Sequence, residues 1–142
     1  MPYPVELTEP MRQELTRLGV RDLRTPEEVD QVLQQSKGSV LLFVNSVCGC
    51  AAGSARPGLA EVMASGRRPD VIASVFAGVD VEATARARTY FKGYPPSSPQ
   101  IALFRDGELV HLIQRHQIEG RTAEEVADSL RKTFDKHIAQ IS

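Results

Sequence analysis

Two residues of this chain can carry thiol chemistry, Cys48 and Cys50, and a single glycine separates them. They follow the run Ser39–Asn45, whose apolar residues on both faces are typical of a strand covered by helices on both sides. A helical pattern comes next, so both thiols should stand at a helix N-terminus. Unpaired backbone N–H groups and the helix dipole stabilise a thiolate there, and the thiolate is the form that attacks a disulfide. We expect Cys48, the first and more exposed, to be the nucleophile and Cys50 to be the resolving thiol.

The one-residue spacing limits the geometry of this pair. A disulfide needs Cα atoms about 4.4–6.8 Å apart, and residues i and i+2 reach that separation in a turn or helix but not in an extended strand. Gly49 favours the closure because glycine adopts backbone angles that other residues resist. Cys48 and Cys50 are therefore the predicted catalytic residues, and Gly49 is predicted to belong to the substrate-binding surface.

Other interpretations of the cysteine pair remain open. The thiols could be buried and inert, or the chain could be an adaptor on a redox scaffold whose chemistry is vestigial. They could also bind a soft metal or an iron–sulfur cluster without catalysis, since thiolates suit such metals. A closed zinc site needs four ligands, and the three histidines lie far from the cysteines in sequence. A metal carrier would therefore need a dimer that supplies four thiols.

The elements around the cysteines predict a mixed sheet between helices. Thr25 and Glu28, like Thr122 and Glu125, form capping boxes that begin helices. Asp106-Gly107 is a two-residue hairpin turn. We also expect a loose arm over residues 1–7, a helix from Thr8, a short strand over 20–23 and a helix that Pro57 should kink. A strand over Val71–Phe76 and a helix over Val81–Lys92, with Tyr94 facing the same side, should follow. The hairpin strands should span Gln100–Arg105 and Glu108–Gln114. After the N-terminal helix the order is β-α-β-α-β-α-β-β-α, which predicts an α/β fold of the thioredoxin-like type with one extra N-terminal helix.

Ser98-Pro99 directly precedes the predicted strand Gln100–Arg105. A thioredoxin-like fold has a cis-proline at this place, facing the cysteine pair, and the residue before it pairs with the bound substrate chain as an added strand. Three prolines are crowded in this loop, and position favours Pro99 as the cis residue. Ser98 and Pro99 are therefore predicted substrate-binding residues.

The chain also resembles the bacilliredoxins. The resemblance lies in Asn45-Ser46-Val47-Cys48-Gly49-Cys50-Ala51-Ala52-Gly53-Ser54-Ala55-Arg56-Pro57, Phe76-Ala77-Gly78, Glu82-Ala83-Thr84-Ala85, Pro96-Ser97-Ser98-Pro99 and Arg115-His116-Gln117-Ile118-Glu119-Gly120. It implies a thioredoxin-like dithiol enzyme that removes bacillithiol from mixed disulfides on client proteins, with disulfide isomerase activity also described in the family. Carried over, Cys48 takes the bacillithiol, and Cys50 or a second bacillithiol resolves the adduct.

The bulk properties exclude some classes of partner. The 142 residues fit one domain, and the net charge of -1 gives no basic surface for nucleic acid or anionic membranes. The N-terminus lacks a basic region followed by an apolar one, so we expect no signal peptide and a cytoplasmic protein, as a monomer or weak homodimer, with no bound cofactor. Arg56 is expected to be solvated, with contact to an anionic thiol ligand as the alternative.

Overall fold

A computed structural model describes residues 3–35, 37–64, 68–91 and 93–138. In chain order its elements are α1 (Val5–Thr16), β1 (Arg21–Asp22), α2 (Pro26–Gln35), β2 (Ser39–Asn45), the π-helical turn η1 (Ala51–Ala55), α3 (Arg56–Met63), β3 (Val71–Phe76), α4 (Val81–Arg88), the 3-10 turn η2 (Thr89–Phe91), β4 (Gln100–Arg105), β5 (Glu108–Ile113), the 3-10 turn η3 (Arg115–Gln117) and α5 (Ala123–His137). The predicted order of strands and helices is confirmed.

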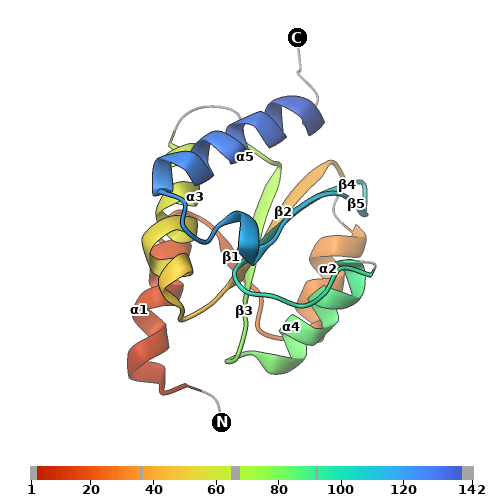
Figure 1. The fold of residues 1–142 in the computed structure, drawn as a ribbon. Helices are drawn as coiled ribbons and strands as arrows, with labels where there is room; N and C mark the ends of the chain where they lie inside the picture. Colours follow the sequence, from red (N-terminus) through yellow and green to blue (C-terminus); the bar gives the residue numbers. More distant parts are fainter. Residues whose placement is uncertain (1–2, 36, 65–67, 92, 139–142) are drawn as a thin grey trace.

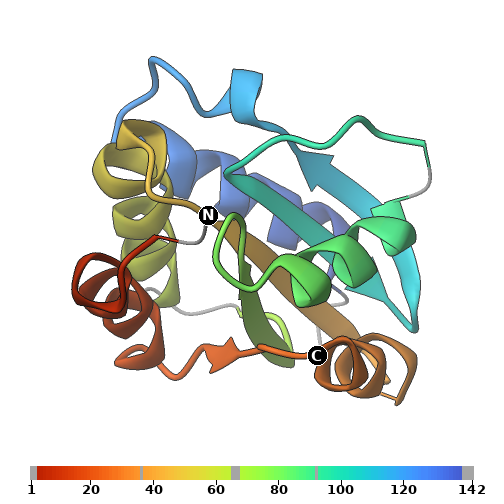
Figure 2. The same ribbon diagram turned by 90° about the horizontal axis from the view of Figure 1, so that it is seen from below.

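The five strands form one mixed sheet in the order β1-β3-β2-β4-β5. β1, β3 and β2 run parallel, whereas β4 is antiparallel to β2 and β5 is antiparallel to β4. Helices α1, α3 and α5 cover one face of the sheet, and α2 and α4 cover the other (Figures 1 and 2). This is the thioredoxin-like α/β architecture that the sequence predicted.

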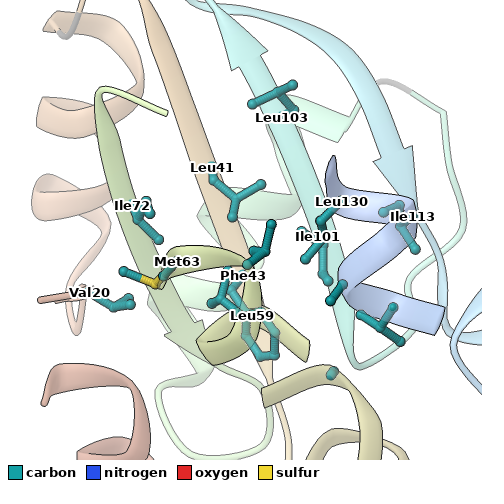
Figure 3. Packing of buried hydrophobic residues seen from close by; sticks show 14 of the residues in the cluster. Val20, Leu41, Phe43, Leu59, Met63, Ile72, Ile101, Leu103, Ile113 and Leu130 are labelled. Atoms are coloured by element: carbon teal, nitrogen blue, oxygen red, sulfur yellow. The ribbon is translucent and has the colours of Figure 1, made fainter. Parts of the chain in front are cut away.

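Every residue of β2 is buried, because the strand lies in the middle of the sheet between two hydrophobic cores. Leu41 and Phe43 point into the core under α3 and α5, while Val40, Leu42 and Val44 point into the core under α2 and α4. Figure 3 shows side chains from the sheet and from the covering helices gathered in the first core. The β2 backbone is thus fixed up to its last residue, which sets the position of the cysteines that follow.

Local sequence signals account for three of the element boundaries. Thr25 and Glu28 exchange side-chain to backbone hydrogen bonds at the start of α2, at 3.1 and 3.2 Å. Thr122 and Glu125 do the same at the start of α5. The hairpin turn has positive φ angles at Asp106 and Gly107, 50° and 85°, which only a few residue types adopt readily.

The N-terminal region differs from the prediction. Helix α1 begins at Val5, with Pro4 as its N-cap, so described residues 5–7 are helical rather than part of a loose arm, and Met1 and Pro2 lie outside the described residues. Thr8 is buried inside α1, where its hydroxyl donates to the Pro4 carbonyl oxygen at 3.3 Å. Thr8 therefore bonds backward along the helix instead of capping its start.

The helix after β3 is also shorter than predicted. α4 ends at Arg88 and continues as the 3-10 turn η2 to Phe91, while Lys92 lies outside the described residues. Phe91 is buried, as its spacing suggested, but Tyr94 is 50% exposed beyond the helix. The tightening from α to 3-10 geometry ends the periodicity that placed Tyr94 inward.

Candidate functional site

Cys48, Gly49 and Cys50 connect the end of β2 to a helical segment, as predicted. The backbone is already helical at Gly49 and Cys50, and the N–H groups of Ala51 and Ala52 both donate to the Cys48 carbonyl oxygen at 3.2 Å. Both cysteines are free thiols and partly buried, and Gly49 between them is exposed. Gly49 has no positive φ, and a Cβ there would meet nothing within 4 Å. In this reduced state glycine is therefore not needed for its backbone freedom, and the space above it is open.

The helix after the thiols is irregular in a way the sequence only partly predicted. Instead of a kink at Pro57, the chain forms the π-helical turn η1 and then α3, with Pro57 in the first turn of α3. A π-helical turn changes the backbone hydrogen-bond pattern just before the residue that lacks an N–H. The irregularity therefore lies between the thiols and Pro57, directly behind the cysteine pair.

Arg56 fixes the loop that leads to Cys48. It is 2% exposed, and its Nη1 donates to Asn45 Oδ1 and to the Ser46 carbonyl oxygen, both at 2.9 Å. Its Nε also lies 3.2 Å from a carboxylate oxygen of Glu14 in α1. The expectation of a solvated arginine is wrong, because the polar groups at the end of β2 need a buried donor and Arg56 provides it.

Ser46 connects this network to the first thiol. Its backbone N–H donates to Asn45 Oδ1 at 2.9 Å, and its Oγ accepts from the Cys48 N–H at 3.0 Å. Asn45 and Ser46 thus both accept hydrogen bonds from the backbone of the loop that leads to the thiols. A buried chain of hydrogen bonds therefore runs from Arg56 through Ser46 to the backbone of Cys48.

The loop before β4 lies opposite Cys48. The cis peptide bond is at Ser98-Pro99, and the Ser98 carbonyl oxygen lies 3.9 Å from Cys48 Sγ, with the thiol as donor. From α4, Arg88 holds this loop by donating to the Ser97 carbonyl oxygen at 2.9 Å. The structure thus brings together Cys48 and Ser98-Pro99, which are 50 residues apart in sequence.

Arg115 is a member of this site that the analysis of the sequence missed. Its Nη1 donates to the Ser98 carbonyl oxygen at 3.2 Å, the same oxygen that Cys48 Sγ approaches. Its backbone N–H donates to Ser97 Oγ at 3.4 Å. The hairpin pattern in the sequence contained a signal for this contact. When cross-strand residue pairs are counted outward from the Asp106-Gly107 turn, Arg115 falls opposite the Ser98-Pro99 loop.

The environment of the two thiols drives their pKa values apart. Burial alone would raise the pKa of Cys48, but the Ser46 hydroxyl, the N–H groups of Ala51 and Cys50, and the charge of Arg115 outweigh it, so the pKa is lowered. For Cys50, burial and then the negative charge of Cys48 raise the pKa. Cys48 is thus the thiol that ionises first.

No group of three or more histidine, cysteine, aspartate or glutamate side chains in the described part of the chain is arranged to hold a metal ion. The described residues also contain no helix long and apolar enough to cross a membrane. Among the residues that the structure describes, the metal-carrier interpretation therefore gains no support from a third ligand beside the two thiols.

The fold and the paired thiols define this chain as a thiol–disulfide oxidoreductase of the thioredoxin fold. The chain is similar to mitochondrial thioredoxin 3 from Saccharomyces cerevisiae, with a TM-score of 0.57 and 18% identity over 87% of this chain and 98% of that one. It is also similar to reduced Schistosoma mansoni thioredoxin, with a TM-score of 0.58 and 15% identity over 84% and 98% of the two chains. At such identities the likeness establishes the fold.

The sequence establishes the family. The chain matches the family described as Disulphide isomerase over residues 3–138, and it belongs to that family. Its relatives include the bacilliredoxin of Salinibacter ruber, 52% identical over 96% of this chain and 82% of the relative. Another is a bacilliredoxin of Geobacillus kaustophilus, 52% identical over 95% and 94% of the two chains. The resemblance deduced from the motifs is therefore confirmed.

Proposed function

We propose that this enzyme removes bacillithiol from mixed disulfides on client proteins, with Cys48 as nucleophile and Cys50 as resolving thiol. One observation carries the assignment of roles: the surroundings lower the pKa of Cys48 and raise that of Cys50. The proposed nucleophile therefore ionises more readily than its neighbour. The name of the relatives supports bacillithiol as the thiol that is transferred.

The reaction has two exchange steps, and each breaks one S–S bond and forms another. The Cys48 thiolate attacks the bacillithiol sulfur of the mixed disulfide, and the client cysteine leaves as a thiolate. Cys50 then loses its proton to water and attacks Cys48, which releases bacillithiol as a thiolate and leaves a Cys48–Cys50 disulfide. Alternatively, a second bacillithiol attacks the adduct and leaves as bacillithiol disulfide. A low-molecular-weight thiol that reduces the Cys48–Cys50 bond returns the enzyme to its starting state.

The residues around the thiols have separate parts in this proposal. Gly49 keeps the space above the pair open, since it is exposed and lacks a side chain. Ser98 and Pro99 form the opposite wall, where the Ser98 carbonyl oxygen lies 3.9 Å from Cys48 Sγ, and they can bind the client backbone there. The same two thiols can also exchange disulfides within a client, so isomerase activity belongs to the proposal. A reducing, cytoplasmic location fits this chemistry.

The proposal is tested with a peptide that carries one bacillithiol mixed disulfide, wild-type enzyme and the matched variants Cys48→Ser and Cys50→Ser. Cys50→Ser should release one equivalent of peptide and keep bacillithiol on Cys48, visible by intact-mass spectrometry. Cys48→Ser should release none. If Cys48→Ser cleaves the mixed disulfide as fast as wild type, or the adduct forms on Cys50, the assignment of roles is wrong.

A further inference from the structure

Arg115 lies close to Cys48, across the loop before β4. It begins η3, two residues after the end of β5, and its side chain reaches across to the loop before β4. Arg115 Nη1 and Cys48 Sγ lie 3.2 and 3.9 Å from the same Ser98 carbonyl oxygen. Arg115 Nη1 therefore lies within about 7 Å of Cys48 Sγ, close enough to meet a group bonded to that sulfur.

The other two arginines of this site are occupied by the protein itself. Arg56 is 2% exposed and bonded to Asn45 and Ser46. Arg88 is half-buried and bonded to the Ser97 carbonyl oxygen. Both hold loops in place and neither presents its charge to solvent at the thiol.

Arg115 differs because its side chain is 41% exposed. It lies 3.5 Å from a carboxylate oxygen of Glu119, which is itself 51% exposed. A guanidinium has five N–H donors in a planar fork, and the contacts with Ser98 and Glu119 leave donors for a ligand. An exposed ion pair is weak, with a median near 0–1 kcal/mol, so a ligand carboxylate can replace Glu119 at little cost.

We propose that Arg115 is a specificity-determining residue that selects mixed disulfides whose low-molecular-weight thiol carries an anionic group. The proposal rests on the function above, because it needs Cys48 to be the attacking thiol. During attack the guanidinium moves from Glu119 toward the anionic group of the incoming disulfide. Glu119 opposes this selection, since its carboxylate repels the same ligand.

The test compares small disulfides that differ in charge, on a Cys50→Ser background where only the first exchange occurs. The probes are bis(2-sulfonatoethyl) disulfide, bis(2-hydroxyethyl) disulfide and bis(2-aminoethyl) disulfide. In each case the Cys48 thiolate forms a mixed disulfide and one small thiolate leaves. The readout is the ratio of the rate constant for the anionic probe to that for the neutral one. Any change in the thiolate fraction of Cys48 cancels in this ratio, so a purely electronic or structural effect on the thiol does not move it.

Arg115→Gln should lower this ratio about fivefold, the factor that corresponds to about 1 kcal/mol for an exposed charge pair. Arg115→Lys should retain most of the ratio, and Glu119→Gln should raise it. Arg115→Gln should also raise the rate constant for the cationic probe, bis(2-aminoethyl) disulfide, relative to that for the neutral probe. The matched control is Arg131→Gln on α5, because Arg131 is 39% exposed and pairs with Glu61 and Asp128 much as Arg115 pairs with Glu119.

The outcomes separate the two proposals. If Cys48 is modified but Arg115→Gln leaves the ratio unchanged, or Arg131→Gln lowers it equally, Arg115 does not select the ligand and this inference is wrong. If none of the probes modifies Cys48 in the parent protein, the nucleophile assignment fails, and the role of Arg115 fails with it.

Discussion

The hydroxyl of Ser46 offers a direct test of how this fold activates a cysteine. Ser46 is 5% exposed, and its Oγ accepts the Cys48 N–H at 3.0 Å. Its hydroxyl is also the first of the groups that lower the pKa of Cys48 against the effect of burial. Ser46→Ala removes that hydroxyl and should raise the pKa of Cys48.

The size of the effect follows from two opposing contributions. A hydrogen bond to a charged group contributes about 1.5–3 kcal/mol, and the lower end applies here because Cys48 is only partly buried. At a pH below the pKa, losing about 1.5 kcal/mol lowers the thiolate fraction about tenfold. The remaining thiolate is more basic and about threefold more nucleophilic, so the rate at low pH falls only about threefold.

The same reasoning predicts that the pH–rate curves of the two proteins cross. At a pH well above both pKa values each protein is fully thiolate, and Ser46→Ala should then react about threefold faster. The measurement is the rate of Cys48 alkylation by iodoacetamide from pH 5 to pH 10 on a Cys50→Ser background, with thiolate absorbance near 240 nm as an independent titration.

Ser74→Ala is the matched control, because Ser74 is a buried serine of β3 outside the set of residues that shift the Cys48 pKa. Urea unfolding of each variant checks that the fold is intact. If the thiolate of Ser46→Ala titrates at the same pH as that of the parent while Ser74→Ala also leaves it unchanged, the hydroxyl does not stabilise the thiolate and the reasoning is refuted.

Two further predictions concern stability. Gly58→Ala should destabilise the protein by about 1–3 kcal/mol in urea unfolding, because the new Cβ would lie 2.7 Å from a methyl carbon of Val126 where α3 packs on α5. Gly53→Ala, with open space around it, should be neutral or slightly stabilising. Equal effects of the two substitutions would contradict this packing argument. Burial first, and then His137 and Lys136, lower the pKa of His111 from its usual 6.5. The unfolded chain therefore binds the proton more readily, and the free energy of unfolding should fall as the pH drops below about 6.5. His111→Gln should flatten that part of the curve of unfolding free energy against pH, and an unchanged slope would show that another group causes it.

Much of the fold could be predicted from local patterns, because several elements begin or end at a signal a few residues long. The capping boxes at Thr25 and Thr122 and the turn at Asp106-Gly107 occur where expected. The start of α1 could not be predicted in this way. Thr8 has the residue type of an N-cap, yet it is buried within the helix and bonds to Pro4 instead.

The cationic residues of the site show a different limit. Arg56 is only eight residues beyond Cys48, but its burial depends on how α3 packs against the end of β2 and against Glu14 of α1. Arg115 reaches the Ser98 carbonyl oxygen beside the thiol because β5 pairs with β4. A register shift between Leu103 and Phe104 moves that pairing by one residue, so that Ile101 pairs with Ile113.

The sequence by itself determined the strand that ends at the cysteines, the helical turn that follows and the pair of thiols between them, because these depend on neighbours along the chain. Only the tertiary structure decided which charges act on the thiols. The Ser98 carbonyl oxygen, Arg115 and the Arg56 network come to Cys48 from other elements, and their distances depend on strand register and helix packing. Burial and the charge of Arg115 depend on where those elements meet, because electrostatic effects change steeply with distance and burial. The groups of Ser46, Ala51 and Cys50 that lower the pKa of Cys48 are neighbours along the chain.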